Sequence, residues 1–236
     1  MLLTHFLAST LLPEGKGFIS ITGGGGKTTL MEKLGRYLAD NGSSVLMTTT
    51  TKVASPRLHQ YGADFIFEDE SVLGHKPEKG SLVFYAHHHP MDMKKWIAPR
   101  EEVLTILSSM YDVVISEADG SRGLPFKIHT ERDPVIHPST TAVIAVAGLW
   151  GIGEKAYSAV FGSDEDVPVD RDYLERYVKM EEGISKGFID NNAIVFNGAE
   201  CVDSSVLDML MSIVYPENTI VVAASEKEDK IIRIIA

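Results

Sequence analysis

Short apolar runs alternate with helix-length segments along this chain, a pattern that predicts a mainly parallel sheet with crossover helices. The first run, 18–21, is followed by a segment, 28–40, whose apolar residues recur at helical spacing. The pattern indicates an α/β fold of three layers, with helices on both faces of a mostly parallel central sheet. The predicted strands are residues 18–21, 44–48, 64–67, 82–85, 113–116, 142–146, 193–196 and 219–223.

The remaining segments predict a single domain over residues 1–236. Residues 2–12 are apolar but too short to span a bilayer, and they lack the charged start and the cleavage pattern of a signal peptide. They predict a short helix beside the first strand, and the protein is expected in the cytoplasm. The segment around 163–187 is highly charged and contains a helix prediction over 171–182, so we expect a surface lid or a face for a partner.

The residues after the first predicted strand form a glycine-rich loop that leads directly into a helix. Successive glycines let the backbone turn several N–H groups toward one anion, and the helix dipole favours phosphate at the same place. A lysine then adds a compact positive charge, and a threonine hydroxyl can hold Mg²⁺. The expected nucleotide-binding residues of this loop are Gly23, Gly24, Gly25, Gly26, Lys27, Thr28 and Thr29.

This loop departs from the common pattern G-x-x-x-x-G-K-[ST], because Ile21 occupies the position of the first glycine. It is closer to the variant phosphate-binding loops of two groups of P-loop proteins. One is the ParA-, MinD- and CooC-like ATPases, whose signature lysine would fall at Thr22, and the other is the Mur ligases. A glycine-rich turn without a ligand is the simpler alternative. The strand–loop–helix context favours nucleotide phosphate, with ATP and GTP both open.

Two carboxylates follow the apolar strand at 113–116, as in a Walker B strand. Glu117 and Asp119 can hold Mg²⁺ directly or through water, together with Thr28. The stretch also resembles the D-x-x-G element of GTPases, in which the N–H of Gly120 would contact a γ-phosphate. Solvated acids at a strand end are the alternative interpretation. The predicted metal ligands are Thr28, Glu117 and Asp119, and the predicted catalytic residues are Lys27, Glu117, Asp119 and Arg122.

Basic residues follow these carboxylates in the chain. Arg122 and Lys127 could hold a γ-phosphate or an anionic substrate, and a salt bridge that fixes the loop is the alternative. Lys52 ends a run of threonines after the second predicted strand, where it could bind substrate. The location at a strand end favours a functional role for these residues, although β-branched threonines are also common within strands.

Two further positions are candidates for ligand contact. Asn197 lies where GTPases carry the N-K-x-D motif that reads guanine, and it is expected to contact a base, as is Ser225 in a second loop. Gly198 and Glu200 replace the lysine and aspartate of that motif, so guanine specificity is not implied. The histidines at 87–89 indicate either a metal site or an exposed, partner-contacting segment.

Charge and cysteine content limit the partners. The chain carries 33 acidic and 22 basic residues, and a net charge of −11 argues against nucleic acid and anionic membranes as partners. The single cysteine, Cys201, excludes an internal disulfide and suits a reducing compartment.

Three stretches in combination resemble the YqeC family, described as selenium-dependent hydroxylase accessory proteins. They are the glycine loop with its flanks at 21–31, the threonine run at 45–53, and residues 117–127. A Pro-containing stretch at 133–138 adds to the likeness. The resemblance implies a cytoplasmic P-loop protein that assists maturation of selenium-dependent molybdenum hydroxylases, with the hydroxylase or its cofactor-maturation proteins as partners. It does not supply a reaction.

The leading functional prediction is therefore an accessory protein that binds ATP or GTP with Mg²⁺ and hydrolyses it, with a homodimer as one option for its assembly. A second candidate is a small-molecule kinase or Mur-like ligase, in which Arg122, Lys127 and Lys52 would hold the acceptor. A third is a module that binds nucleotide without hydrolysing it, and a fourth is a metallochaperone that uses the histidines at 87–89.

Overall fold

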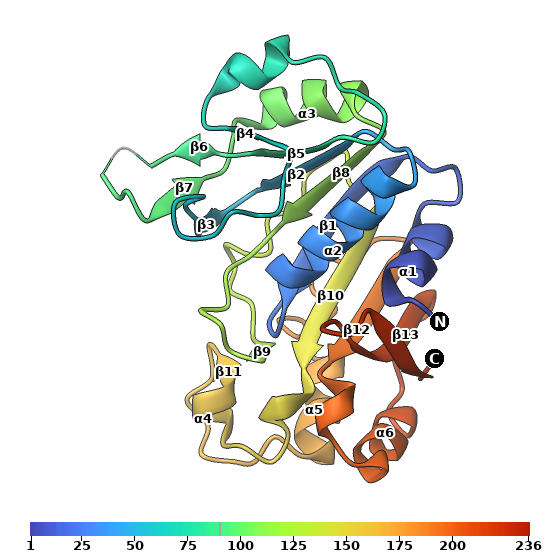
Figure 1. Ribbon diagram of the computed structural model, residues 1–236. Helices are drawn as coiled ribbons and strands as arrows, with labels where there is room; N and C mark the ends of the chain where they lie inside the picture. Colours follow the sequence, from blue (N-terminus) through green and yellow to red (C-terminus); the bar gives the residue numbers. More distant parts are fainter. Residues whose placement is uncertain (90) are drawn as a thin grey trace.

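The computed structural model describes residues 1–89 and 91–236. A nine-stranded sheet in the order β14-β13-β12-β10-β1-β8-β2-β5-β4 forms its centre (Figure 1). Every pair in this sheet is parallel except β13 with β14. Its strands are β1 (Gly17–Gly23), β2 (Val45–Thr49), β4 (Phe65–Phe67), β5 (Leu82–Tyr85), β8 (Val113–Glu117), β10 (Ala142–Gly148), β12 (Asn192–Asn197), β13 (Thr219–Ser225) and β14 (Lys230–Ile234).

Helices cover both faces of the sheet, so the predicted three-layer α/β architecture is confirmed. The helices α1 (Leu3–Leu11) and α2 (Lys27–Asp40) pack on one face, where every second strand residue joins one apolar cluster. The alternate strand residues face two clusters on the other side. Those clusters are covered by α3 (Glu101–Met110), α5 (Arg171–Lys179) and α6 (Ser204–Met211) (Figure 1).

The eight predicted strands are all present, with ends within two residues of their predicted positions. The sequence patterns missed the edge strand β14 and two small sheets. One small sheet has the order β3-β7-β6, and the other pairs β9 with β11. Their strands are β3 (Lys52–Ala54), β6 (His87–His88), β7 (Lys95–Ile97), β9 (Phe126–Lys127) and β11 (Val160–Phe161).

The charged segment at 163–187 is held against the sheet by the apolar side of α5. This helix begins as predicted but ends at Lys179, and Gly183 follows in a tight turn whose N–H donates to Met180 O. The buried residues of α5 are Tyr173, Leu174, Tyr177 and Val178. A lid or partner role for this segment stays a prediction.

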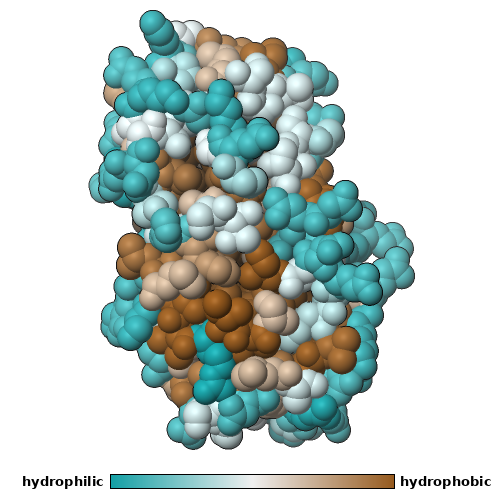
Figure 2. Space-filling view, turned by 90° about the vertical axis from the view of Figure 1, so that its right-hand side faces the viewer, coloured by the Kyte–Doolittle hydropathy of each residue, from teal (hydrophilic) through white to brown (hydrophobic). Residues whose placement is uncertain are grey.

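The two ends of the chain meet beside α1. The backbone N–H and the hydroxyl of Thr4 both donate to the carboxylate of Asp229, at 2.9 and 2.7 Å. Figure 2 shows a broad apolar area in the lower half of the face that carries both termini. Large apolar side chains exposed near the termini and on or after α6 are Met1, Leu2, Met211, Val214, Ile232 and Ile234.

A contiguous apolar area of this kind is typical of a surface that contacts another protein. It agrees with the homodimer option, which stays a prediction. Within residues 1–89 and 91–236, no helix is both long enough and apolar enough to cross a membrane.

Candidate functional site

The glycine loop, residues 23–26, is clamped between two segments of backbone. The N–H of Gly24 donates to Val146 O at the end of β10 (2.9 Å), and the N–H of Gly25 donates to Leu124 O (3.1 Å). A Cβ on Gly23 would lie 2.3 Å from Val146 O, and a Cβ on Gly24 would lie 2.5 Å from Leu124 O. Consecutive glycines are therefore required here by close packing as well as by the positive φ of Gly23 and Gly25.

Four consecutive backbone amides are left without an acceptor in the described residues where the glycine loop enters α2. The N–H groups of Gly26, Lys27, Thr28 and Thr29 donate to no acceptor in the described part of the chain, and the first helical bond runs from Leu30 N to Gly26 O. A helix N-terminus with unpaired amides carries a partial positive charge and attracts anions. The loop thus has the geometry to receive a phosphate.

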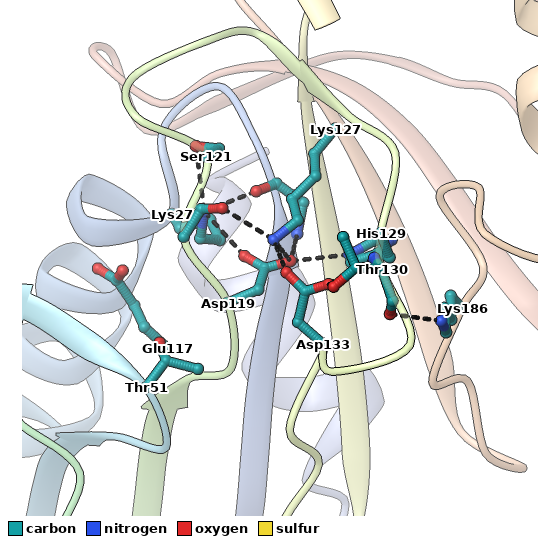
Figure 3. Close-up of polar contacts among 12 residues, drawn as sticks. Lys27, Thr51, Glu117, Asp119, Ser121, Lys127, His129, Thr130, Asp133 and Lys186 are labelled. Carbon is teal, nitrogen blue, oxygen red and sulfur yellow. Dashed lines mark hydrogen bonds and ion pairs between the residues drawn. The ribbon is translucent and has the colours of Figure 1, made fainter. Parts of the chain in front are cut away.

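Lys27 bends back over the glycine loop (Figure 3). Its Nζ donates to Gly23 O at 2.6 Å and lies 3.0 Å from Asp119 Oδ1 and 3.4 Å from the hydroxyl of Ser121. The side chain is almost fully buried. A lysine placed in this way can exchange its protein partners for a phosphate oxygen without leaving the loop.

Asp119 is the centre of a buried polar network (Figure 3). Its Oδ2 accepts hydrogen bonds from Gly23 N and His129 Nε2, both at 2.8 Å, and lies 3.7 Å from Lys127 Nζ. Burial opposes ionisation of this carboxyl, but Lys27, His129 and Lys127 outweigh that effect and lower its pKa to about 2. Oδ2 is thus occupied by protein donors, whereas Oδ1 has no hydrogen-bond donor among the described residues and lies 3.0 Å from the Lys27 ammonium. Asp119 ties the glycine loop to the segment that follows β8.

Lys127 belongs to the same network and not to the open site. Its side chain is fully buried, and its Nζ donates to Gly120 O at 2.8 Å and to the carboxylate of Asp133. In this arrangement Lys127 fixes the loop after β8, which is the salt-bridge alternative that the sequence left open.

Glu117 and Thr28 form the second contact across the site. The hydroxyl of Thr28, in the first turn of α2, donates to the carboxylate of Glu117 at the end of β8. Burial raises the pKa of Glu117, and the positive charge of Lys27 partly opposes the shift. A hydroxyl and a carboxylate side by side are oxygen ligands of the kind that Mg²⁺ takes, so these two residues fit a magnesium site. Asp119 is held by Gly23 N and His129 through Oδ2 and is paired with Lys27 through Oδ1, and its metal role stays a prediction.

The threonines at the end of β2 and just after it mainly donate hydrogen bonds to backbone oxygens. The hydroxyl of Thr49 donates to Glu117 O at 3.0 Å, and the hydroxyl of Thr50 donates to Val135 O at 2.6 Å. Thr51 donates its N–H to the hydroxyl of Thr49 at 3.0 Å. These contacts hold the end of β2 against β8 and so fix the position of Glu117.

A cavity of about 860 Å³ opens over the glycine loop and α2. One side is formed by β3, β7 and the chain around His59 and Tyr61, and another by residues after β10 and β12. On the second side, the Trp150 ring lies against the backbone of Gly148 and Gly198, since a Cβ on either would lie within 3 Å of the ring. The indole is about half exposed, so an aromatic surface is available beside the loop.

Asn197 fastens the glycine loop to the ends of β12 and β13. Its Nδ2 donates to Gly25 O at 2.9 Å, and its Oδ1 accepts from Gly198 N at 2.7 Å and from Glu226 N at 3.0 Å. Ser225 is fully buried beside it. The second amide hydrogen of Asn197 has no protein acceptor among the described residues. Contact between Asn197 and a base stays a prediction.

Glu226 is a buried acid that the sequence patterns did not single out. It is 2% exposed, its Oε1 has no hydrogen-bond partner among the described residues, and its Oε2 lies where a Cβ on Gly26 would clash with it. Burial raises its pKa to about 9, against a smaller opposing effect of Lys33. Glu226 therefore keeps its proton at neutral pH. No local motif marks it, because its burial depends on the packing of β13 against the loop.

The raised pKa of Glu226 predicts a pH-dependent stability. An acid whose folded pKa lies above its unfolded value stabilises the fold fully below the unfolded pKa, near 4.5, and that contribution is lost as pH rises toward 9. We expect Glu226→Gln, which imitates the protonated acid, to exceed wild type in unfolding free energy by about 1–3 kcal/mol at pH 8 and to match it near pH 5. Urea unfolding of the ligand-free protein at both pH values measures this. A difference that is independent of pH would contradict the assignment.

Arg122 and the histidines at 87–89 lie outside the buried network. Arg122 has a left-handed backbone, with φ of 52°, and its guanidinium lies 5.3 Å from the centre of the Phe161 ring. The His87 ring forms a hydrogen bond with the hydroxyl of Tyr85, at 2.9 Å. In the part of the chain that the structure describes, no three or more His, Cys, Asp or Glu side chains gather as they would around a metal ion.

Comparison with known proteins gives two findings. The family model described as YqeC protein matches residues 19–163, which include the glycine loop, Glu117 and the network of Asp119. An uncharacterized protein YqeC of Escherichia coli (strain K12) is 36% identical over 140 residues, which cover 58% of this chain and 54% of that relative. The match thus spans about half the length of the curated relative. Since the family model covers more than half of the chain, this protein belongs to the YqeC protein family.

Proposed function

We propose that this protein binds a nucleoside triphosphate with Mg²⁺ over the glycine loop and hydrolyses it. The single observation that carries the proposal is the row of four amides at the start of α2 that have no acceptor among the described residues, with the Lys27 ammonium folded over the same loop. Such a row binds the phosphate chain of nucleotides in loops of this type. The net charge of the protein is −11, so this local positive site is not a by-product of its composition.

Each residue has a role in the proposed complex. The amides and Lys27 would hold the β- and γ-phosphates, and Thr28 with Glu117 would hold the magnesium ion. The bound ion would neutralise charge on the transferring phosphoryl group. Arg122 lines the same cavity, where it can contact the γ-phosphate or an anion bound beside it. Trp150 offers a surface on which a base can stack, and Asn197 retains one donor at its edge.

The biological role that we propose follows from the family resemblance. Nucleotide binding and release would drive a step in the maturation of a selenium-dependent molybdenum hydroxylase, with that enzyme or its cofactor-maturation proteins as partner. The segments that would respond to the γ-phosphate are the threonine run and the loop at Gly120, since both adjoin Glu117.

A second candidate function is transfer of the phosphoryl group to a small acceptor, as in a kinase or ligase. Exposed cations on the β3 side of the cavity favour it. A protein that retains nucleotide without turnover, even with its partner present, would correspond to the non-hydrolysing alternative.

Magnesium dependence tests the proposed metal site. For wild type, we expect chelation of Mg²⁺ to weaken ATP or GTP binding at least ~10-fold, because the ion links the phosphates to Thr28 and Glu117. In Glu117→Gln the same chelation should change the affinity by less than ~3-fold, and calorimetry with and without Mg²⁺ measures both. The exposed Glu14→Gln is the matched control and should behave as wild type. An unchanged magnesium dependence in Glu117→Gln would remove Glu117 from the site.

A further inference from the structure

The small sheet β3-β7-β6 places two lysines on one face beside the cavity. In the antiparallel register Lys52 lies opposite Ile97, and Lys95 lies opposite Ala54. Because cross-strand partners share a face and neighbours along a strand alternate, the two lysines occupy the same face. Their strand neighbours, Val53 and Trp96, are buried in the core. The apolar side thus anchors the small sheet, while both lysines are exposed and line the cavity.

A third cation, Arg122, reaches the same cavity from the loop after β8. Its left-handed φ of 52° is unusual for a residue with a side chain, and such strain is retained where a neighbouring function requires it. The guanidinium stacks over Phe161 at 5.3 Å, a contact that orients it without neutralising its charge.

In the part of the chain that the structure describes, these three cations have no acidic partners, unlike the lysines of the buried network. Lys27 is paired with Asp119, and Lys127 with Asp133. Among residues 1–89 and 91–236, neither Lys52, Lys95 nor Arg122 takes part in an ion pair.

Among the described residues that line the cavity, three acids face six lysines and arginines, so positive charge is in excess. Glu226 is held neutral by its burial, and Glu117 is bonded to Thr28. Glu200 lines the same cavity with Trp150 and Gly198, in the chain that follows β12. Like charges gathered around one cavity repel one another, and a bound anion relieves that repulsion.

We propose that Lys52, Lys95 and Arg122 form a second subsite, which binds an anionic small molecule beside the nucleotide. The ligand is a phosphate- or carboxylate-bearing compound, because compact anions of these two kinds match an arginine and two lysines. Its role as a second substrate rests on the proposed nucleotide function, whereas anion binding at the subsite does not. The subsite differs from the acceptor site expected from the sequence, since Lys95 takes the place of the buried Lys127.

Calorimetry with two simple anions tests this subsite. The protein is first saturated with Mg²⁺ and a non-hydrolysable triphosphate analogue, which fills the glycine loop, and is then titrated with inorganic phosphate or with succinate at low salt. We expect wild type to bind one equivalent of anion. The double variant Lys52→Ala, Lys95→Ala should bind it at least ~10-fold more weakly, since two charge-assisted contacts are removed. Preference for phosphate or for succinate identifies which class of ligand the subsite takes.

The matched control removes two positive charges nearby without touching the cavity. Arg57→Ala, Lys94→Ala changes exposed residues of the same region and should leave anion binding as in wild type. Equal weakening in both double variants, or no anion binding to the loaded wild type, would overturn the subsite. If the analogue itself does not bind, the proposed nucleotide function fails, and the titrations are repeated in Lys27→Ala. Phosphate or succinate binding that still depends on Lys52 and Lys95 would then support the subsite alone, and its absence would overturn it.

Discussion

Replacing Lys27 with alanine is expected to weaken ATP or GTP binding by about 10- to 150-fold, because hydrogen bonds from a charged donor to phosphate contribute about 1.5–3 kcal/mol. In the free protein the Lys27 ammonium already lies over the glycine loop, 2.6 Å from Gly23 O. Little side-chain reorganisation is therefore needed for it to contact a phosphate. Isothermal calorimetry in the presence of Mg²⁺ measures the change in affinity.

The comparison needs a lysine on the same strand–helix unit that has no contact with the loop. Lys16 precedes β1 at the opposite end of the strand, and its side chain is exposed. Lys16→Ala should therefore bind nucleotide as wild type does. Thermal melting of each variant separates loss of binding from loss of fold. Equal nucleotide affinity in Lys27→Ala and wild type would exclude the glycine loop as the phosphate site.

The second large effect is expected on stability, from Asp119→Ala. Removing this carboxylate leaves Lys27, Lys127 and His129 close together without their shared partner, and leaves Gly23 N without an acceptor. Breaking a buried ion pair from one side destabilises proteins by about 3–5 kcal/mol. We expect a loss of that size in the free energy of unfolding, measured by urea denaturation at neutral pH without nucleotide.

Two variants sharpen the interpretation of that loss. Asp164→Ala removes an exposed carboxylate and should change the unfolding free energy by less than about 0.5 kcal/mol. Asp119→Asn keeps the shape of the side chain and one oxygen for Gly23 N, so it should lose less than Asp119→Ala. A loss below about 1 kcal/mol in Asp119→Ala would show that the network does not hold the loop, and would favour the metal role predicted from the sequence.

Much of the fold could be predicted because its strands are apolar on both faces. A parallel sheet that is covered by helices on both sides makes each strand a continuous apolar run, as in residues 142–146 and 193–196. The strands that were missed lack this property. β3 and β7 are three residues long and half exposed, and β14 is an edge strand with one face toward solvent.

The site could be predicted only as far as its local motifs extend. The glycine loop, Thr28 and Glu117 are placed by one strand–loop–helix unit and by the strand beside it, so sequence and topology suffice. The structural position of Asp119 depends on Lys127 in β9 and on His129 just after it, a two-residue strand and its continuation that no short pattern describes. Trp150 and Glu226 join the cavity through packing between distant strands, and they carried no signal in the sequence.

Direct titration of the wild-type protein with ATP and with GTP, each with Mg²⁺, tests the central claim. Trp150 lies half exposed in the cavity whereas Trp96 is buried, so tryptophan emission reports on the site while calorimetry gives affinity and stoichiometry. We predict one nucleotide bound per chain with micromolar or tighter affinity, accompanied by a change in Trp150 emission that Trp150→Phe abolishes. No heat and no change in emission with either nucleotide would contradict the account.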